Sequence, residues 1–199
     1  MGCKVILIRH GLTYWNARKM MQGQVNIPLN DVGVRQARGL ARQISPFPLD
    51  VCYASPLGRS LKTAQLALED RDIPIIKDER LIEHGYGLLE STSYRRTPWF
   101  RLTSQAYNYE CRPEAACEDV YARARSFIDE VLLPEAERHD GILVAGHGGV
   151  NCAIMGCLFD IPLKDFWSVK QANCGYTVID VDNGTPAIEY STPVEVNAR

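Results

Sequence analysis

Four basic side chains of this chain come shortly after apolar runs that are typical of buried strands: Arg9, His10, Arg59 and His147. Parallel strands present their carboxyl ends at one edge of a sheet, so we expect the four side chains to converge there. Arginine offers a planar fork of donors that suits phosphate, and histidine can act near neutral pH as nucleophile, acid or base. The pattern predicts a pocket for a phosphoryl group.

Glycines accompany both histidines of this pattern. Gly11 follows His10, and Gly148 and Gly149 follow His147. Glycine lets the backbone turn sharply and approach a ligand closely, and the later pair leaves backbone N–H groups open at the start of a helix. The Arg-His pair alone is equally consistent with a solvated strand end, but the repetition of the pattern favours a site.

Four ordered motifs carry a resemblance to a known family. They are Arg9-His10-Gly11 with Asn16, Ser55-Pro56-Leu57 with Arg59, Leu81-Ile82-Glu83, and His147-Gly148-Gly149. In type and order they resemble the phosphoglycerate mutase-like branch of the histidine phosphatase superfamily. The resemblance spans most of the chain, although the segment from about 92 to 117 contributes little to it.

The resemblance implies a role for each candidate residue. His10 attacks phosphorus as a neutral imidazole, and its other ring nitrogen donates to a backbone carbonyl. The remaining catalytic candidates are Arg9 and Arg59, which neutralise the phosphoryl oxygens, His147, which does the same either as a cation or as a donor, and Glu83, the acid and base. Candidates for substrate binding are Thr13, Asn16, Gln22, Gly23 and Gly148, although Gln22 by itself is also consistent with an ordinary surface loop. We expect no cofactor and no metal.

Three functions remain open. The first is a metal-independent phosphatase that hydrolyses small phosphomonoesters through a phosphohistidine. The second is a cofactor-dependent phosphoglycerate mutase, and the third is a phosphate-binding protein without turnover. A metal site made of His10, Glu83 and His147 is disfavoured because two arginines would repel a cation in the same pocket. The segment after Glu83 is shorter than in the family's mutases and holds a single proline, Pro98, which favours the phosphatase.

The chain departs from the family at three places. Leu89-Glu90-Ser91 replaces a common Trp-Glu-Gly, and Ala115-Ala116 replaces an acid and a serine. Asn151-Cys152 stands where many relatives carry an arginine. None of these positions is expected to touch the transferred group, so the departures bear on the choice of substrate.

The elements predicted around the site indicate an α/β protein. We expect a single domain over residues 1–199, folded as a three-layer α/β/α sandwich with a mostly parallel sheet, and a small helical lid at about 92–117. Asn30 is expected to cap a helix. A longer helix is expected over 114–138, which Pro134 would kink or end unless it opens a further turn. Asp182-Asn183-Gly184 predicts a hairpin.

Composition narrows the partners of this protein. The formal net charge of −2 and the lack of a basic run argue against a nucleic-acid surface. No stretch approaches the roughly 18 apolar residues of a membrane span. Seven cysteines without a CxxC pair are expected to be reduced thiols in the cytoplasm. We expect a small phosphorylated metabolite as partner, while the oligomeric state is open, with a homodimer among the options.

Overall fold

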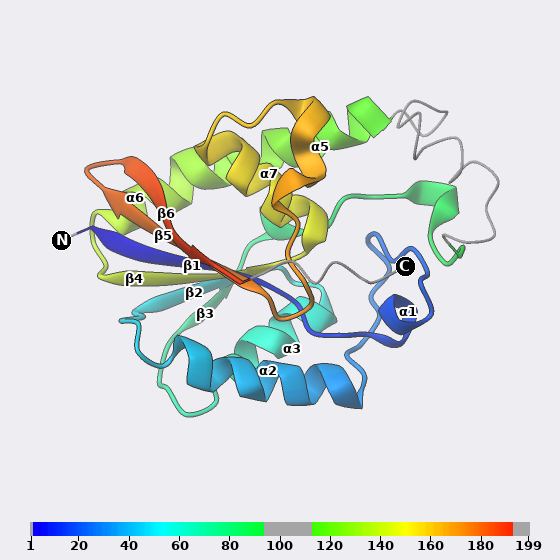
Figure 1. The fold of residues 1–199 in the computed structure, drawn as a ribbon, viewed down its shortest axis with the longest axis horizontal. Helices are drawn as coiled ribbons and strands as arrows, with labels where there is room; N and C mark the ends of the chain where they lie inside the picture. Colours follow the sequence, from blue (N-terminus) through cyan, green and yellow to red (C-terminus); the bar gives the residue numbers. More distant parts are fainter. Residues whose placement is uncertain (1, 94–112, 193–199) are drawn as a thin grey trace.

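A six-stranded sheet forms the centre of the computed structural model, which describes residues 2–93 and 113–192 (Figure 1). Its strands are β1 (Cys3–Arg9), β2 (Val51–Ala54), β3 (Ile75–Lys77), β4 (Gly141–Gly146), β5 (Tyr176–Asp182) and β6 (Thr185–Ser191). They are ordered β3-β2-β4-β1-β5-β6; the first four are parallel, and β5 and β6 run antiparallel to their neighbours. The prediction of a mostly parallel sheet is confirmed.

Helices cover both faces of the sheet. One face carries α2 (Asp31–Ile44) and α3 (Gly58–Ala67), and the other carries α5 (Pro113–Phe127), α6 (Leu133–Ala136) and α7 (Gly148–Leu158) (Figure 1). Short helices are α1 (Tyr14–Ala17), η1 (Glu79–Leu81), η2 (Gly87–Leu89) and η4 (Leu163–Val169). The three-layer α/β/α prediction is confirmed, while the expected lid at 92–117 lies mostly outside the described residues.

The middle of β1, Val5 to Ile8, is buried on both faces, which explains its unbroken apolar sequence. Val5 and Leu7 pack in the core with α5 and α7, whereas Ile6 and Ile8 pack in the core with α2 and α3. A stretch with no solvated face has no place for polar side chains. Arg9 and His10 are therefore the first positions after this stretch at which the chain can present functional groups.

Pro134 opens a further helical turn rather than ending the long helix. The π-helical segment η3 (Ile128–Leu132) joins α5 to α6, in whose first turn Pro134 lies. Proline has no N–H to donate and its ring crowds the preceding turn, and a widened turn accommodates both.

The predicted hairpin is confirmed as well, because Asn183 and Gly184 have φ values of 49° and 74°, as a type I′ turn requires.

No helix within residues 2–93 and 113–192 has the length and apolar composition needed to cross a bilayer.

The predicted cap of α2 supplies a test of the fold. The side-chain oxygen of Asn30 accepts a hydrogen bond of 2.8 Å from the Gly33 N–H. Asn30→Ala should lower the free energy of unfolding by about 1 kcal/mol, because that buried N–H loses its partner. Ser45→Ala at the other end of the helix is the control, since its exposed hydroxyl bonds only to the Arg42 carbonyl. Urea unfolding that shows equal losses for both variants would contradict the assigned cap.

Candidate active site

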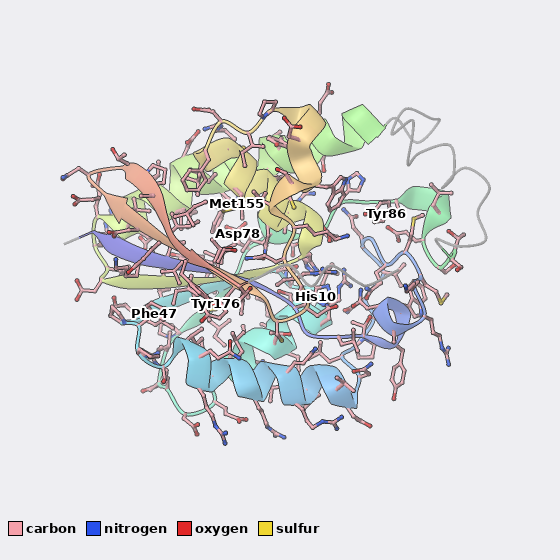
Figure 2. All side chains as sticks on the ribbon, viewed as in Figure 1. His10, Phe47, Asp78, Tyr86, Met155 and Tyr176 are labelled. Carbon is pink, nitrogen blue, oxygen red and sulfur yellow. The ribbon has the colours of Figure 1, made fainter. Side chains whose placement is uncertain are left out.

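His10 lies just beyond the carboxyl end of β1, buried to 3% exposure (Figure 2). Its Nδ1 atom lies 2.7 Å from the carbonyl oxygen of Gly11. A carbonyl can only accept, so Nδ1 carries the proton and Nε2 keeps its lone pair. Burial, followed by the charges of Arg59 and Arg9, holds the pKa of His10 well below its usual value. The ring is neutral at physiological pH, as a nucleophile must be.

Arg59 lies in the first turn of α3 and is completely buried. Its two terminal nitrogens donate to the carbonyl oxygens of Val25 and Gly23, each at 2.7 Å. Burial lowers the pKa of Arg59 to about 10, with the charge of Glu83 acting in the opposite direction. The side chain is therefore still a cation at neutral pH, and it holds the loop before α2 in place.

Arg9 supplies a second cation at the same edge of the sheet. Its Nη1 donates to the Gln171 carbonyl at 2.6 Å, and its Nε is buried without a hydrogen-bond partner among the described residues, as is Nε of Arg59. Neither arginine forms a salt bridge within the described part of the chain. Unpaired buried charges are costly, so this arrangement favours an incoming anion.

His147 ends β4 and caps α7 beside His10, with 5.2 Å between the two ring centroids. Its Nε2 lies 2.8 Å from the Ser55 hydroxyl, and its Nδ1 is buried with no partner in the described residues. Burial, followed by the charges of Arg59, His10, Arg9 and Arg123, holds the pKa of His147 well below the usual value. The sequence left its charge state open, and the structure makes it neutral.

Glu83 binds the amino-terminal end of α7. Its carboxylate accepts from the backbone N–H groups of Gly149, at 2.9 and 3.1 Å, and Val150, at 3.1 Å. The N–H of His84 adds a further bond of 2.9 Å. Such a helix end attracts negative charge through its free N–H groups and its dipole. A Cβ on Gly149 would lie 2.6 Å from Oε1 of Glu83, so only glycine fits here without displacing the carboxylate.

The other substrate-binding candidates join the same network. Asn16 closes a capping box with Thr13, its oxygen accepting from the Thr13 N–H at 3.2 Å, so that its NH₂ group is left to donate to a ligand. The oxygen of Gln22 lies 2.8 Å from the Thr13 hydroxyl. A Cβ on Gly148 would lie 3.6 Å from the Arg9 guanidinium and 3.8 Å from Glu83, so this glycine separates cation from carboxylate.

Three residues that hold the site together were not predicted. Asn173 donates to the carbonyls of His10 and Gly11, at 3.0 and 3.3 Å, and so fixes the turn that carries the predicted nucleophile. Gln171 anchors its own segment by donating to the Leu7 carbonyl at 2.9 Å. The sequence signal is two amide residues placed just before a buried strand, which is too common to identify a site by itself.

Glu90 is the third such residue. Its Oε1 accepts from the N–H groups of Gln24 and Tyr86, at 2.9 and 3.1 Å, which joins the loop held by Arg59 to the segment that follows Glu83. Ser91, which stands where many relatives have glycine, adopts φ 70°. Ser91 thus adopts a left-handed backbone conformation that favours glycine, and Glu90 beside it supplies a bridging carboxylate.

This geometry defines an anion-binding site with a poised imidazole at the carboxyl edge of an α/β sheet. The sequence matches the histidine phosphatase superfamily (branch 1) over residues 5–192, and the chain belongs to that family.

Named relatives divide between hydrolases and mutases. The chain is 32% identical over 187 residues to phosphoserine phosphatase 1 of Hydrogenobacter thermophilus, covering 90% of this chain and 87% of the relative. It is 30% identical over 180 residues to a 2,3-bisphosphoglycerate-dependent phosphoglycerate mutase of Methylobacterium sp., covering 82% and 86%. A mutant phosphoserine phosphatase from Entamoeba histolytica, solved in complex with phosphoserine, superposes with a TM-score of 0.77 at 25% identity, covering 97% and 98%.

No three His, Cys, Asp or Glu side chains come close enough to hold a metal ion anywhere in residues 2–93 and 113–192. Of the three ligands weighed in the sequence, Glu83 is instead occupied by backbone N–H groups.

Gly149→Ala tests whether Glu83 must be bound at the start of α7. The added methyl group should push the carboxylate off the helix end and lower kcat about a hundredfold or more, within the range for loss of an acid–base group. Gly39→Ala is the matched control. Gly39 lies in a different helix, α2, and a Cβ added there meets nothing within 4 Å. The control should keep its kcat and gain up to about 1 kcal/mol of stability. Wild-type kcat in Gly149→Ala would show that the position of Glu83 does not matter.

The two neutral imidazoles predict how stability depends on pH. Below about pH 6.5 the unfolded chain protonates His10 and His147, whereas the folded protein does not, since their pKa values are lowered. The free energy of unfolding should therefore fall as the pH drops, with a contribution of up to about 2.7 kcal/mol per pH unit from two protons. Urea unfolding from pH 7.5 to 5.5 measures the slope. His10→Asn should remove about half of this contribution, and an unchanged slope would contradict it.

Proposed function

We propose that this protein is a phosphatase that hydrolyses small phosphomonoesters through a phosphohistidine on His10. The observation that carries the proposal is a neutral imidazole beside the fully buried guanidinium of Arg59 and the half-buried guanidinium of Arg9, neither of which has a carboxylate partner in the described residues. A phosphoryl dianion would satisfy both charges at once. Family membership and the named phosphatase relative support this reaction class.

In the first half-reaction, Nε2 of His10 forms a bond to phosphorus as the bond to the leaving oxygen breaks. Glu83 in its protonated form gives its proton to that oxygen. Arg9, Arg59 and the NH₂ group of Asn16 stabilise the charge on the three remaining oxygens. The carbonyl of Gly11 orients the imidazole and stabilises the positive charge that the ring gains on attack.

The second half-reaction restores the enzyme. The Glu83 carboxylate takes a proton from a water molecule. At the same time the water oxygen attacks phosphorus, and the bond between phosphorus and Nε2 of His10 breaks. Inorganic phosphate leaves, the imidazole is neutral again, and Glu83 is protonated for the next cycle. The segment that carries Glu83 is held in place by Arg123, which donates to the carbonyls of Arg80 and Ile82 at 2.8 and 2.7 Å.

Hydrolysis rather than mutase activity is proposed from the sequence after Glu83. A mutase must keep water away from the phosphohistidine while a bisphosphate reorients, which calls for a second anion site and a closed cover. The segment is short and carries only Pro98, with Arg95, Arg96 and Arg101 as the cations available for such a site; all lie outside the described residues. O-Phosphoserine is the first substrate to test, given the phosphoserine phosphatase relative.

We also propose a cytoplasmic location, because the five described cysteines are free thiols: Cys3, Cys52, Cys152, Cys157 and Cys174.

Phosphate release in the presence of EDTA tests the proposed function. The purified protein should hydrolyse O-phosphoserine or p-nitrophenyl phosphate, and rapid quench should trap phosphate on the enzyme in an acid-labile, base-stable form. His10→Ala should lower kcat at least about a thousandfold, because the nucleophile is lost. His139→Ala is the control, since that histidine lies at the surface, 3.1 Å from Glu135.

Each competing function gives a different result. Conversion of 3- to 2-phosphoglycerate, primed with 2,3-bisphosphoglycerate, far faster than hydrolysis would identify a mutase. Phosphate binding without turnover of any ester would identify a binding protein. Loss of activity with EDTA, restored by a divalent cation, would show a requirement for metal. Substantial activity in His10→Ala would refute the covalent intermediate.

A further inference from the structure

The hydroxyl of Ser55 has no part in the reaction as described, yet it is completely buried against His147. Ser55 follows the end of β2, and its Oγ lies 2.8 Å from Nε2 of His147. The other ring nitrogen, Nδ1, is buried and lacks a partner among the described residues. A neutral imidazole carries one proton on one of these two nitrogens, and the choice decides what Nδ1 can bind.

The hydrogen bonds of Ser55 decide that choice. Its Oγ already accepts a long bond of 3.4 Å from the Leu57 N–H, and its own hydrogen needs an acceptor because the group is buried. Within residues 2–93 and 113–192, Nε2 of His147 is the only acceptor bonded to this hydroxyl. If Nε2 carried the proton instead, the Ser55 hydrogen would be left unsatisfied. The balance therefore favours a proton on Nδ1 and a lone pair on Nε2.

The topology of the sheet gives the direction in which Nδ1 points. The strand β4, which His147 directly follows, lies between β2 and β1. Nε2 is directed toward Ser55 on the β2 side, and because the two nitrogens flank Cε1, their hydrogen-bonding directions diverge widely in the plane of the ring. Nδ1 is thus directed toward the β1 side, where the ring of His10 lies at a centroid distance of 5.2 Å.

We propose that Ser55 is a positioning residue that holds His147 as the Nδ1–H tautomer and so aims a neutral N–H donor at the phosphoryl group on His10. The tautomer is inferred from Ser55 and His147 alone. The inference rests on the proposed function only where it identifies a phosphoryl oxygen as the acceptor for the Nδ1–H group. The opposite tautomer would present a lone pair to that oxygen and repel it. The Ser55 hydroxyl, which bonds to His147 and not to the phosphoryl group, thereby decides whether Nδ1 of His147 attracts or repels the phosphoryl oxygen.

Ser55→Ala removes the hydrogen that fixes the tautomer. Ser60→Ala is the matched control: Ser60 is equally buried and lies in the same segment, but its hydroxyl donates to the Ala145 carbonyl at 2.8 Å. Nitrogen-15 spectra of ring-labelled histidines report which nitrogen of His147 is protonated, with signals assigned against His147→Asn. Inorganic phosphate titration and steady-state kinetics complete the set, and urea unfolding checks that both variants fold.

In the wild type and in Ser60→Ala, Nδ1 of His147 should carry the proton. In Ser55→Ala the proton should move at least partly to Nε2, the Kd for phosphate should rise, and kcat should fall about a hundredfold, the lower end of the range for loss of one transition-state donor. Ser55→Thr, which keeps the hydroxyl, should restore the Nδ1 tautomer and most of the rate.

A wild-type proton on Nε2, or equal kcat in Ser55→Ala and Ser60→Ala, would overturn the assignment. The spectra and the phosphate titration need no turnover. An Nδ1 proton with tight phosphate binding but no hydrolysis would therefore support the tautomer while refuting the proposed phosphatase.

Discussion

The site depends on two guanidinium charges, that of Arg59 fully buried and that of Arg9 half-buried, which have no carboxylate partner in the described residues. Backbone carbonyls of Gly23, Val25 and Gln171 bond to them, but carbonyls solvate a cation without neutralising it. Burial first, and then the surplus positive charge, lowers the pKa values of His10 and His147 and keeps both rings neutral, and the same charge makes the pocket complementary to an anion. The cost of burying that charge is offset when an anion binds.

The start of α7 supplies the second electrostatic element. His147 caps this helix, and the N–H groups of the next turn bind Glu83. One helix end therefore positions both His147, the proposed donor to the phosphoryl group, and Glu83, the proposed acid and base. Gly149 makes this feasible, because a Cβ there would lie 2.6 Å from Oε1 of Glu83, whereas a Cβ on Gly148 would make only ordinary contacts with Arg9 and Glu83. The glycine at 149 is thus needed for the space that it leaves.

Amide side chains give the site its rigidity. Asn173 ties the turn after β1 to the segment before β5, and the amide of Asn151 donates to the Ile8 carbonyl at 3.0 Å and to Gln171 at 2.7 Å. Neutral amides can bond to several carbonyls without adding charge, so they position Arg9 and His10 without disturbing the balance around them. Asn151, which stands where many relatives carry an arginine, has this structural role here.

The sequence by itself determined the layered fold, the elements that end at the site and the identity of the basic residues there. Apolar runs, caps and glycines are local signals, and burial on both faces of β1 leaves its carboxyl end as the place for chemistry. Only the tertiary structure decided the partners of these groups. Arg59 bonds to a loop more than 30 positions away, Glu83 to the start of α7, and Ser55 to His147 across 92 positions. Proton positions and charge states follow from such distant contacts, because desolvation and hydrogen bonding depend on what surrounds a group in space rather than along the chain.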